Sequence, residues 1–253
     1  MRKCAIFAGG DMPDLRCYKK WSYWEKYSCF ICADCGYRHA LRLGILPDVI
    51  VGDFDSYSEE LPKGVEELRS VPEKDDTDTL MAVKKAIELG YRNIDLYGAL
   101  GGKRFEHSFA NIQAMIYALQ QGCRLEIKGE SHLLVQEADE GTVTYDNMDG
   151  GVYLSVFALT ESVGIEFLRG VKYPLEDYRM VQSFPIGVSN PLDGVLLLRQ
   201  HILYLFQLSG CFNILLAADN QVPLLGSQFG SLGLEGFDRV LYLFAVDIDG
   251  YFT

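Results

Sequence analysis

The chain has 253 residues, of which 49% are hydrophobic and 23% are charged. It can therefore bury a large core, as one large domain or two small ones. The formal net charge of −12 argues against nucleic acid or an anionic membrane as a partner, because both reward a surplus of Lys and Arg. A substrate that carries phosphate would need a metal ion and a few local basic groups.

The N-terminal residues 1–14 contain only a short apolar run before a Gly-Gly-Asp turn. That run is too short for a signal peptide, and it predicts a first strand and turn in a cytoplasmic protein. The cysteines number seven, which fits reduced thiols better than a disulfide framework. Cys29, Cys32 and Cys35 have the spacing of iron–sulfur ligands, but the next cysteine is Cys123. Because the segment reads as a buried strand, buried thiols are favoured over a cluster or a zinc site.

Strand and helix patterns alternate along the N-terminal half of the chain. Apolar runs predict strands at residues 4–8, 30–33, 49–51, 94–97 and 125–127. A helix should follow the motif at 74–78, since Leu80, Val83 and Ile87 recur at helical spacing and Gly90 supplies a stop. This alternation predicts an α/β fold with a mainly parallel sheet and flanking helices.

A second helix is expected from about residue 106 to residue 121, closing at Gly122. Its predicted apolar face consists of Phe109, Ile112, Met115, Ile116 and Leu119. In sheets of this kind, ligands bind beyond the carboxyl ends of the strands. Asp34, Asp53, Asp55 and the glycine-rich residues 98–102 all fall just after predicted strands.

The character of the sequence changes after residue 128. Short strand-like runs at 142–145, 152–157, 164–167 and 180–184 are separated by Gly, Asp-Asn and Pro, with no convincing helix between them. We therefore expect an α/β domain at 1–128, a smaller all-β sandwich at 129–208, and a C-terminal extension of unknown role at 209–253. Residues 202–218 are apolar enough to suggest a membrane-spanning segment. Their length is at the short limit for such a segment, so an extension is favoured.

Three acidic motifs carry the best functional clue: residues 52–56, 74–78 and 101–107. Asp53 and Asp55 are two residues apart, so an extended backbone would place both side chains on one face. Hard divalent cations such as Mg2+ bind one or two carboxylates and fill the remaining positions with water and substrate phosphates. Taken singly, the acids can be turn residues or helix caps, but all three motifs lie where such a sheet binds ligands.

The glycine-rich segment 98–102 opens onto the second helix, so its backbone N–H groups are candidates for phosphate oxygens. It is not a Walker A loop, because Tyr97 stands where glycine is needed and Arg104 stands where Ser or Thr is needed. It is not a dinucleotide fingerprint either. Alone, the segment is a weak signal.

Together these motifs resemble the thiamine pyrophosphokinases in order and approximate spacing. The resemblance rests on Ala-Asp-Cys-Gly at 33–36, Gly-Asp-Phe-Asp-Ser at 52–56, Lys-Asp-Asp-Thr-Asp at 74–78 and the segment 98–107, and it extends roughly over residues 1–205. It implies a homodimer that transfers a diphosphate from ATP to thiamine with Mg2+, giving thiamine diphosphate and AMP. It also implies an α/β catalytic domain and a β-sandwich thiamine-binding domain.

The resemblance carries roles onto matching positions. Asp53, Asp55 and Asp78 would bind Mg2+, Asp75 or Glu106 would orient or deprotonate the thiamine hydroxyl, and Arg104 would meet the phosphates. The residues expected to contact nucleotide or thiamine are Asp34, Thr77, Gly98, Gly101, Gly102, Lys103, Ser189 and Asn190. Three positions depart from the family: Cys35 replaces a glycine, Glu106 an aspartate and Pro191 a glutamate.

Two other functions remain open. The first is a pyrophosphokinase for another hydroxymethyl heterocycle, such as a pterin, although Ser189 and Asn190 favour thiamine. The second is a non-catalytic thiamine or nucleotide sensor, which Glu106, Pro191 and the unusual C-terminal tail suggest. A pure sensor would not need the acidic cluster.

Overall fold

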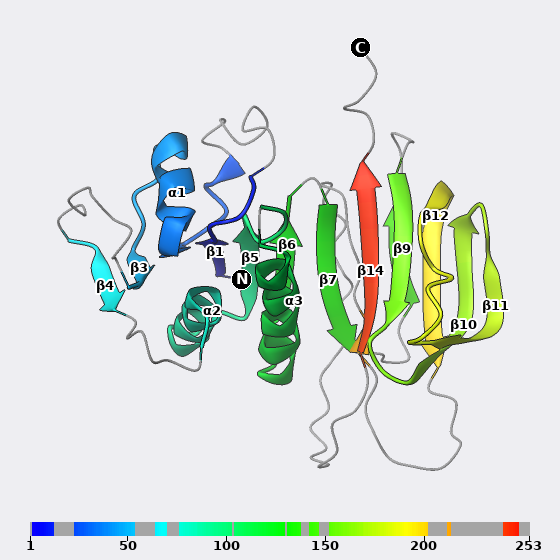
Figure 1. Ribbon diagram of the computed structural model, residues 1–253. Helices are drawn as coiled ribbons and strands as arrows, with labels where there is room; N and C mark the ends of the chain where they lie inside the picture. The colour runs from blue at the N-terminus through cyan, green and yellow to red at the C-terminus, as the bar shows by residue number, and fades with distance from the viewer. Residues whose placement is uncertain are drawn as a thin grey trace. The chain divides into compact units, whose positions relative to one another are not determined.

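The computed structural model describes residues 2–12, 23–53, 64–69, 76–102, 104–129, 131–137, 142–146, 152–201, 212–213 and 240–247. The chain divides into two compact units, Met1–Glu130 and Ser131–Thr253, each described below by itself. Figure 1 shows helices only in the first unit. Among the described residues, no helix is long and apolar enough to cross a membrane.

The first unit is built on a parallel sheet with the strand order β6-β5-β1-β2-β3-β4. The strands are β1 (Lys3–Phe7), β2 (Cys29–Ala33), β3 (Val49–Gly52), β4 (Glu66–Arg69), β5 (Asn93–Tyr97) and β6 (Arg124–Lys128). All five strands expected from apolar runs are present. The sequence analysis missed β4, because its Glu-Glu-Leu-Arg sequence has no apolar run.

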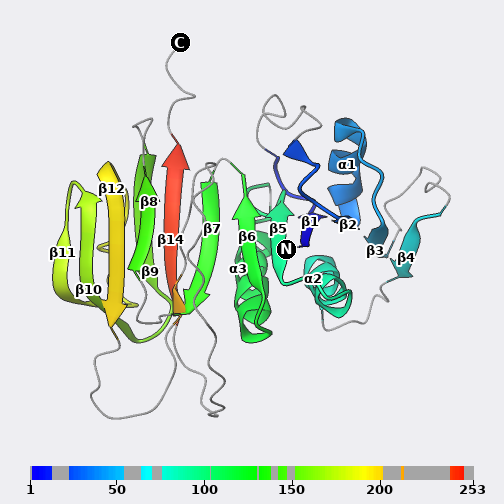
Figure 2. The same ribbon diagram turned by 180° about the vertical axis from the view of Figure 1, so that it is seen from behind.

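The sheet is covered on both faces, as the continuous apolar strands require. On one face, α1 (Tyr37–Leu43) packs against a core that includes Phe7, Trp24, Ile50 and Tyr97. The helices α2 (Asp78–Glu88) and α3 (Phe105–Gln120) lie side by side against the opposite face (Figure 2). The α/β part of the predicted fold class is confirmed.

The two longer helices begin and end close to their predicted positions. Thr77 caps α2 by accepting a hydrogen bond from the Leu80 N–H at 3.1 Å, and Gly90 follows with a left-handed φ of 86°. The predicted apolar face of α3 was wrong in part, because Phe109 is 54% exposed. The buried residues of this helix are Asn111, Ala114, Met115 and Ala118. Two of these four are alanines, and a face of small side chains allows a helix to approach the sheet closely.

The second unit is antiparallel except for one short parallel contact. It contains β7 (Ser131–Glu137), β8 (Thr142–Asp146), β9 (Val152–Ala158), β10 (Ser162–Val171), β11 (Leu175–Val181), β12 (Asn190–His201), β13 (Phe212–Asn213) and β14 (Val240–Asp247). β12 pairs with β8, β9 and β10, and β10 also pairs with β11. Buried side chains include Leu154, Val156, Val163, Ile165, Leu168, Met180, Leu196 and Leu198. An all-β unit was expected here, and this part of the fold class is confirmed.

Part of the predicted C-terminal extension is built into this sheet. β14 pairs with β7 on one side and with β9 on the other, both antiparallel. Those eight residues therefore supply an internal strand and are not an appendage. The other residues of 209–253, apart from β13, lie outside the described part of the chain, as does most of 202–218. The remaining domain boundaries stay predictions.

A substitution at Gly36 would test how tightly the start of α1 packs against the sheet. A Cβ on Gly36 would lie 1.9 Å from the carbonyl oxygen of Phe7, although its φ of −57° is open to any residue. We expect Gly36→Ala to destabilise the protein by about 3 kcal/mol, because backbone atoms must move. In Gly44→Ala, nothing lies within 4 Å of the new Cβ and only the left-handed φ of 71° is strained, so the loss should be about 1 kcal/mol. Urea unfolding would measure both, and equal losses would contradict the steric argument.

Candidate active site

The turns that follow β1 and β5 are joined by a short ladder of backbone hydrogen bonds. Ala8 N–H donates to the Tyr97 carbonyl at 2.8 Å and Gly10 N–H to the Gly98 carbonyl at 2.7 Å. Asp11 N–H donates to the Leu100 carbonyl at 3.1 Å. The pairing of the two central strands therefore continues into the loops at their carboxyl ends, where ligands bind in sheets of this type.

The backbone of the glycine turn, residues 98–102, also forms hydrogen bonds with two side chains from outside the turn. The buried Asn111 of α3 donates its Nδ2–H to the Ala99 carbonyl at 2.7 Å. The Oδ2 atom of Asp11 accepts from the Gly102 N–H at 2.6 Å. Gly98, with a φ of 61°, lies so close to β1 that a Cβ would stand 2.5 Å from the Ala8 carbonyl oxygen. The turn is thus preorganised by its neighbours.

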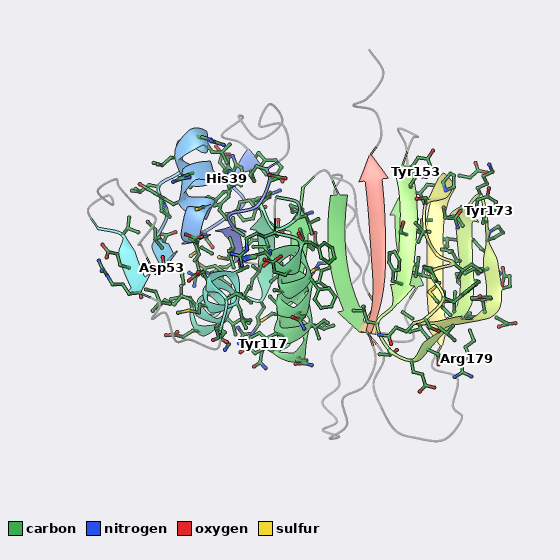
Figure 3. All side chains as sticks on the ribbon, viewed as in Figure 1. His39, Asp53, Tyr117, Tyr153, Tyr173 and Arg179 are labelled. Carbon is green, nitrogen blue, oxygen red and sulfur yellow. The ribbon has the colours of Figure 1, made fainter. Side chains whose placement is uncertain are left out.

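His39 of α1 contacts the turn after β1 and is 9% exposed (Figure 3). Its Nε2 is 2.9 Å from the Gly10 carbonyl, and since a carbonyl only accepts, Nε2 carries the proton. Nδ1 is buried and has no partner among the described residues. Burial lowers the pKa of this ring, and the nearby Arg42 lowers it further, whereas the hydrogen bond to Gly10 and the Asp11 charge oppose them. The neutral ring therefore supports the β1 turn.

Asp34 and Cys35 form the turn after β2. Asp34 takes the left-handed conformation with a φ of 48°, and its Oδ1 lies 3.7 Å from the Cys35 Sγ. Burial raises the pKa of the Cys35 thiol, and the charges of Asp34 and Asp53 raise it further, while Arg38 opposes them. The carboxylates that follow β2 and β3 therefore both lie close enough to this thiol to affect its pKa. Gly36 is the glycine that this turn requires for steric reasons. The turn can therefore accommodate a cysteine at position 35.

The start of α2 carries the second acidic motif. Asp78 lies in the first turn of the helix, where a carboxylate complements the helix dipole. Asp76 pairs instead with Lys84 at 2.6 Å, which raises the pKa of that lysine. Asp78 and Asp53 are thus the predicted metal ligands that the structure describes. Asp55, Asp75 and Lys103 lie outside the described residues, and their predicted roles stay predictions.

At the start of α3, Arg104 and Glu106 form an exposed ion pair with a 2.7 Å contact between Nε and Oε1. The hydrogen bond from Arg104 lowers the pKa of Glu106. The glutamate that replaces the family aspartate is therefore ionised and bound to the arginine expected to meet phosphates. Phe105, between them, is 78% exposed.

In the second unit, Ser189 and Asn190 play different parts. Ser189 is exposed and left-handed, with a φ of 54°, and its N–H donates to the Ser155 hydroxyl at 2.9 Å. The buried Asn190 accepts from the Tyr173 N–H at 2.9 Å and donates to the Tyr173 carbonyl at 2.7 Å. Its amide is thus used in holding Tyr173, whose side chain is 60% exposed (Figure 3).

The spacing of Cys29, Cys32 and Cys35 raised an iron–sulfur alternative, which depends on where these thiols point. Cys29 and Cys32 are three residues apart in β2, so they point to opposite faces of the sheet. Cys32 belongs to the core against α1, and Cys29 stands opposite Cys4. Both thiols are buried, as the sequence analysis favoured.

Comparison with known proteins finds the same resemblance. The family model described as "Thiamin pyrophosphokinase, catalytic domain" matches residues 21–127, which include the turns after β2, β3 and β5. Residues 21–127 are therefore similar to the catalytic domain of thiamin pyrophosphokinases. The resemblance inferred from the acidic motifs is confirmed.

Individual thiamine pyrophosphokinases are similar over a larger part of the chain. The protein of Bacillus subtilis (strain 168) is 28% identical over 201 residues, which cover 76% of this chain and 90% of that protein. A crystal structure of the B. subtilis enzyme superposes with a TM-score of 0.71 at 21% identity, covering 98% of this chain and 100% of that one. For the Geobacillus thermodenitrificans structure the TM-score is 0.67 at 23% identity, covering 99% and 100%. These structures have the same fold.

Three residues that position the turns after β1 and β5 were not predicted from the sequence: Asp11, His39 and Asn111. The Gly-Gly-Asp turn was noticed, but it was read only as the end of the first strand. A polar residue within the buried stripe of a helix was an available signal for Asn111. Nothing in the sequence pattern distinguishes His39, because its role depends on how α1 packs.

His39 should make stability depend on pH. Its pKa is below the usual value of 6.5 in the folded protein, so the unfolded chain binds the proton more tightly. The contribution of neutral His39 is complete above 6.5 and is lost as the pH falls through the folded pKa. We expect the stability advantage of the wild type over His39→Gln to shrink by about 1 kcal/mol between about pH 7.5 and about pH 5. Urea unfolding measures it, the exposed His107→Gln is the control, and parallel pH profiles for wild type and His39→Gln would contradict the assignment.

Proposed function

We propose that this protein is a thiamine pyrophosphokinase that transfers the diphosphate of ATP to the thiamine hydroxyl in the presence of Mg2+. The products would be thiamine diphosphate and AMP. The observation that carries the proposal is the preorganised glycine turn, in the same unit as Asp34 after β2, Asp53 after β3 and Asp78 at the start of α2. Its N–H groups suit phosphate oxygens, and the acids suit a hard cation.

Backbone strain adds independent support. Among the described residues, left-handed non-glycine conformations occur at Asp34, Asp177 and Ser189. Two of these three residues are predicted site residues. Such a conformation costs of order 1 kcal/mol and persists where the surroundings enforce it, commonly at functional sites.

The donor set fits Mg2+, because Asp53 and Asp78 offer carboxylate oxygens and such a site needs only one or two of them. Bound there, the ion would neutralise phosphate charge and orient the diphosphate for in-line attack. Asp55 is the third proposed ligand. Arg104, with Lys103, would bind phosphate oxygens through its planar donor fork, and it would have to exchange Glu106 for the substrate.

The proton acceptor is better assigned to Asp75 than to Glu106. The lowered pKa of Glu106 makes it a weak base, since efficient general bases have a pKa near the working pH. We therefore propose that Glu106 positions Arg104 and that Asp75 receives or orients the hydroxyl proton. Thr77 would remain the cap of α2.

On the thiamine side, we propose that the Ser189 hydroxyl and the Tyr173 ring contact the substrate. An exposed aromatic ring on a rigid backbone suits the flat face of a heterocycle. Asn190 would act by holding Tyr173, because both ends of its amide already have partners. A homodimer is proposed from the family resemblance alone.

The decisive measurement is the reaction itself. Purified protein with ATP, Mg2+ and thiamine should yield thiamine diphosphate and AMP, and Asp53→Asn should lower kcat/KM by about 100-fold or more. Circular dichroism and thermal unfolding would check that the variant is folded. Replacing thiamine with a hydroxymethyl pterin tests whether the protein is instead a pyrophosphokinase for another hydroxymethyl heterocycle. Thiamine or nucleotide binding by the wild type without any product would favour the sensor.

The role of Tyr173 makes a separate prediction. Tyr173→Ala should raise the KM for thiamine about tenfold and leave the KM for ATP nearly unchanged, because only the heterocycle loses its stacking partner. Tyr173→Phe is the matched control and should retain most of the affinity for thiamine. Equal changes in both KM values would contradict a thiamine-specific contact.

A further inference from the structure

Asp11 has a contact that the proposed reaction does not use. Its Oδ2 accepts the Gly102 N–H at 2.6 Å, within the glycine turn proposed to bind phosphate. The same oxygen would lie 2.6 Å from a Cβ on Gly101. The Asp11 carboxylate therefore lies close to both Gly101 and Gly102, whose φ values are 74° and 79°.

A carboxylate oxygen and a phosphate oxygen are alternative ligands for the same N–H group. Both are anionic acceptors that form short, charge-assisted hydrogen bonds with backbone amides. One N–H donates to one well-placed acceptor at a time, so the two ligands exclude each other. Asp11, Gly101 and Gly102 are all exposed, so a ligand from solvent can reach the turn.

The carboxylate can leave this position without disturbing the turn. The backbone of Asp11 is held by its own N–H, which donates to the Leu100 carbonyl, and Gly10 is held by Gly98. Rotation of the Asp11 side chain alone would therefore expose the Gly102 N–H. The carboxylate and an arriving phosphate are both negatively charged, and among the described residues no Lys or Arg side chain pairs with Asp11.

We propose that the Asp11 carboxylate is an internal competitor for the nucleotide phosphate at the Gly102 N–H. It occupies this N–H when no nucleotide is bound and turns away when a phosphate oxygen arrives. Asp11 thereby sets nucleotide affinity. The inference rests on the proposed function, because that function places the phosphates of ATP at the glycine turn.

Isothermal titration of ADP into the full chain tests the competition, with EDTA in one series and Mg2+ in the other. Asp11→Ala removes both the charge and the acceptor, whereas Asp11→Asn keeps an acceptor and removes the charge. Both should bind ADP more tightly than the wild type, by about threefold to tenfold for Asp11→Ala, the size expected for one exposed hydrogen bond. The gain should be larger in EDTA, where the phosphate charge is not neutralised.

Glu25→Gln is the matched control, because it removes one exposed carboxylate elsewhere in the same unit. Its affinity for ADP should equal that of the wild type, and an equal gain would assign the effect to net charge and overturn the proposal. Unchanged or weaker ADP binding by both Asp11 variants would also overturn the proposal. It would indicate that Asp11 supports the glycine turn or itself contributes to nucleotide binding.

The same samples separate this inference from the proposed function. ADP binding by the wild type without formation of thiamine diphosphate would overturn only the proposed function. Product formation together with weaker binding by the Asp11 variants would overturn only the competition. A wild type that binds no nucleotide would overturn both.

Discussion

The close approach of backbone to backbone at the carboxyl ends of β1 and β5 is the constraint on which the site depends. Gly98 and Gly36 can lie against the Ala8 and Phe7 carbonyls only because neither has a side chain. This contact brings the β1 turn, the β5 turn and the start of α1 together. Every proposed phosphate contact in the glycine turn follows from that arrangement, because the turn is held from several sides before any ligand arrives.

Preorganisation of this kind separates two sorts of residue in the site. In the first unit, the buried Asn111 and His39 hold the backbone of the turns after β5 and β1. In the second unit, the buried Asn190 holds the backbone of Tyr173. Arg104 and Glu106 are exposed, and their pairing can change when a ligand binds. Phosphoryl transfer needs little covalent chemistry from the protein, so most of the rate must come from positioning and from charge. The buried residues meet the need for positioning, and the exposed residues meet the need for charge.

The sequence predicted those parts of the molecule in which local pattern and tertiary packing agree. The five apolar strands and the cap of α2 at Thr77 could be read directly, because burial on both faces and capping leave a local signature. β4 could not, since its pairing with β3 depends on position and not on apolar side chains. The burial of α3 was misjudged at Phe109, because periodicity marks a stripe but does not say which edge of it faces the sheet. The partners of Asp11 and His39 are nonlocal, and no spacing in the sequence reveals them.

The departures from the family pattern carry different weight once the contacts are known. Cys35 is harmless to the backbone, since the steric need for glycine falls on Gly36. Glu106 keeps its charge and holds Arg104, so its extra length affects geometry more than electrostatics. Pro191 still offers its carbonyl to the Lys172 N–H, and the neighbouring Asn190 keeps both contacts with Tyr173. The loss of an acid at this position therefore leaves the support of Tyr173 intact.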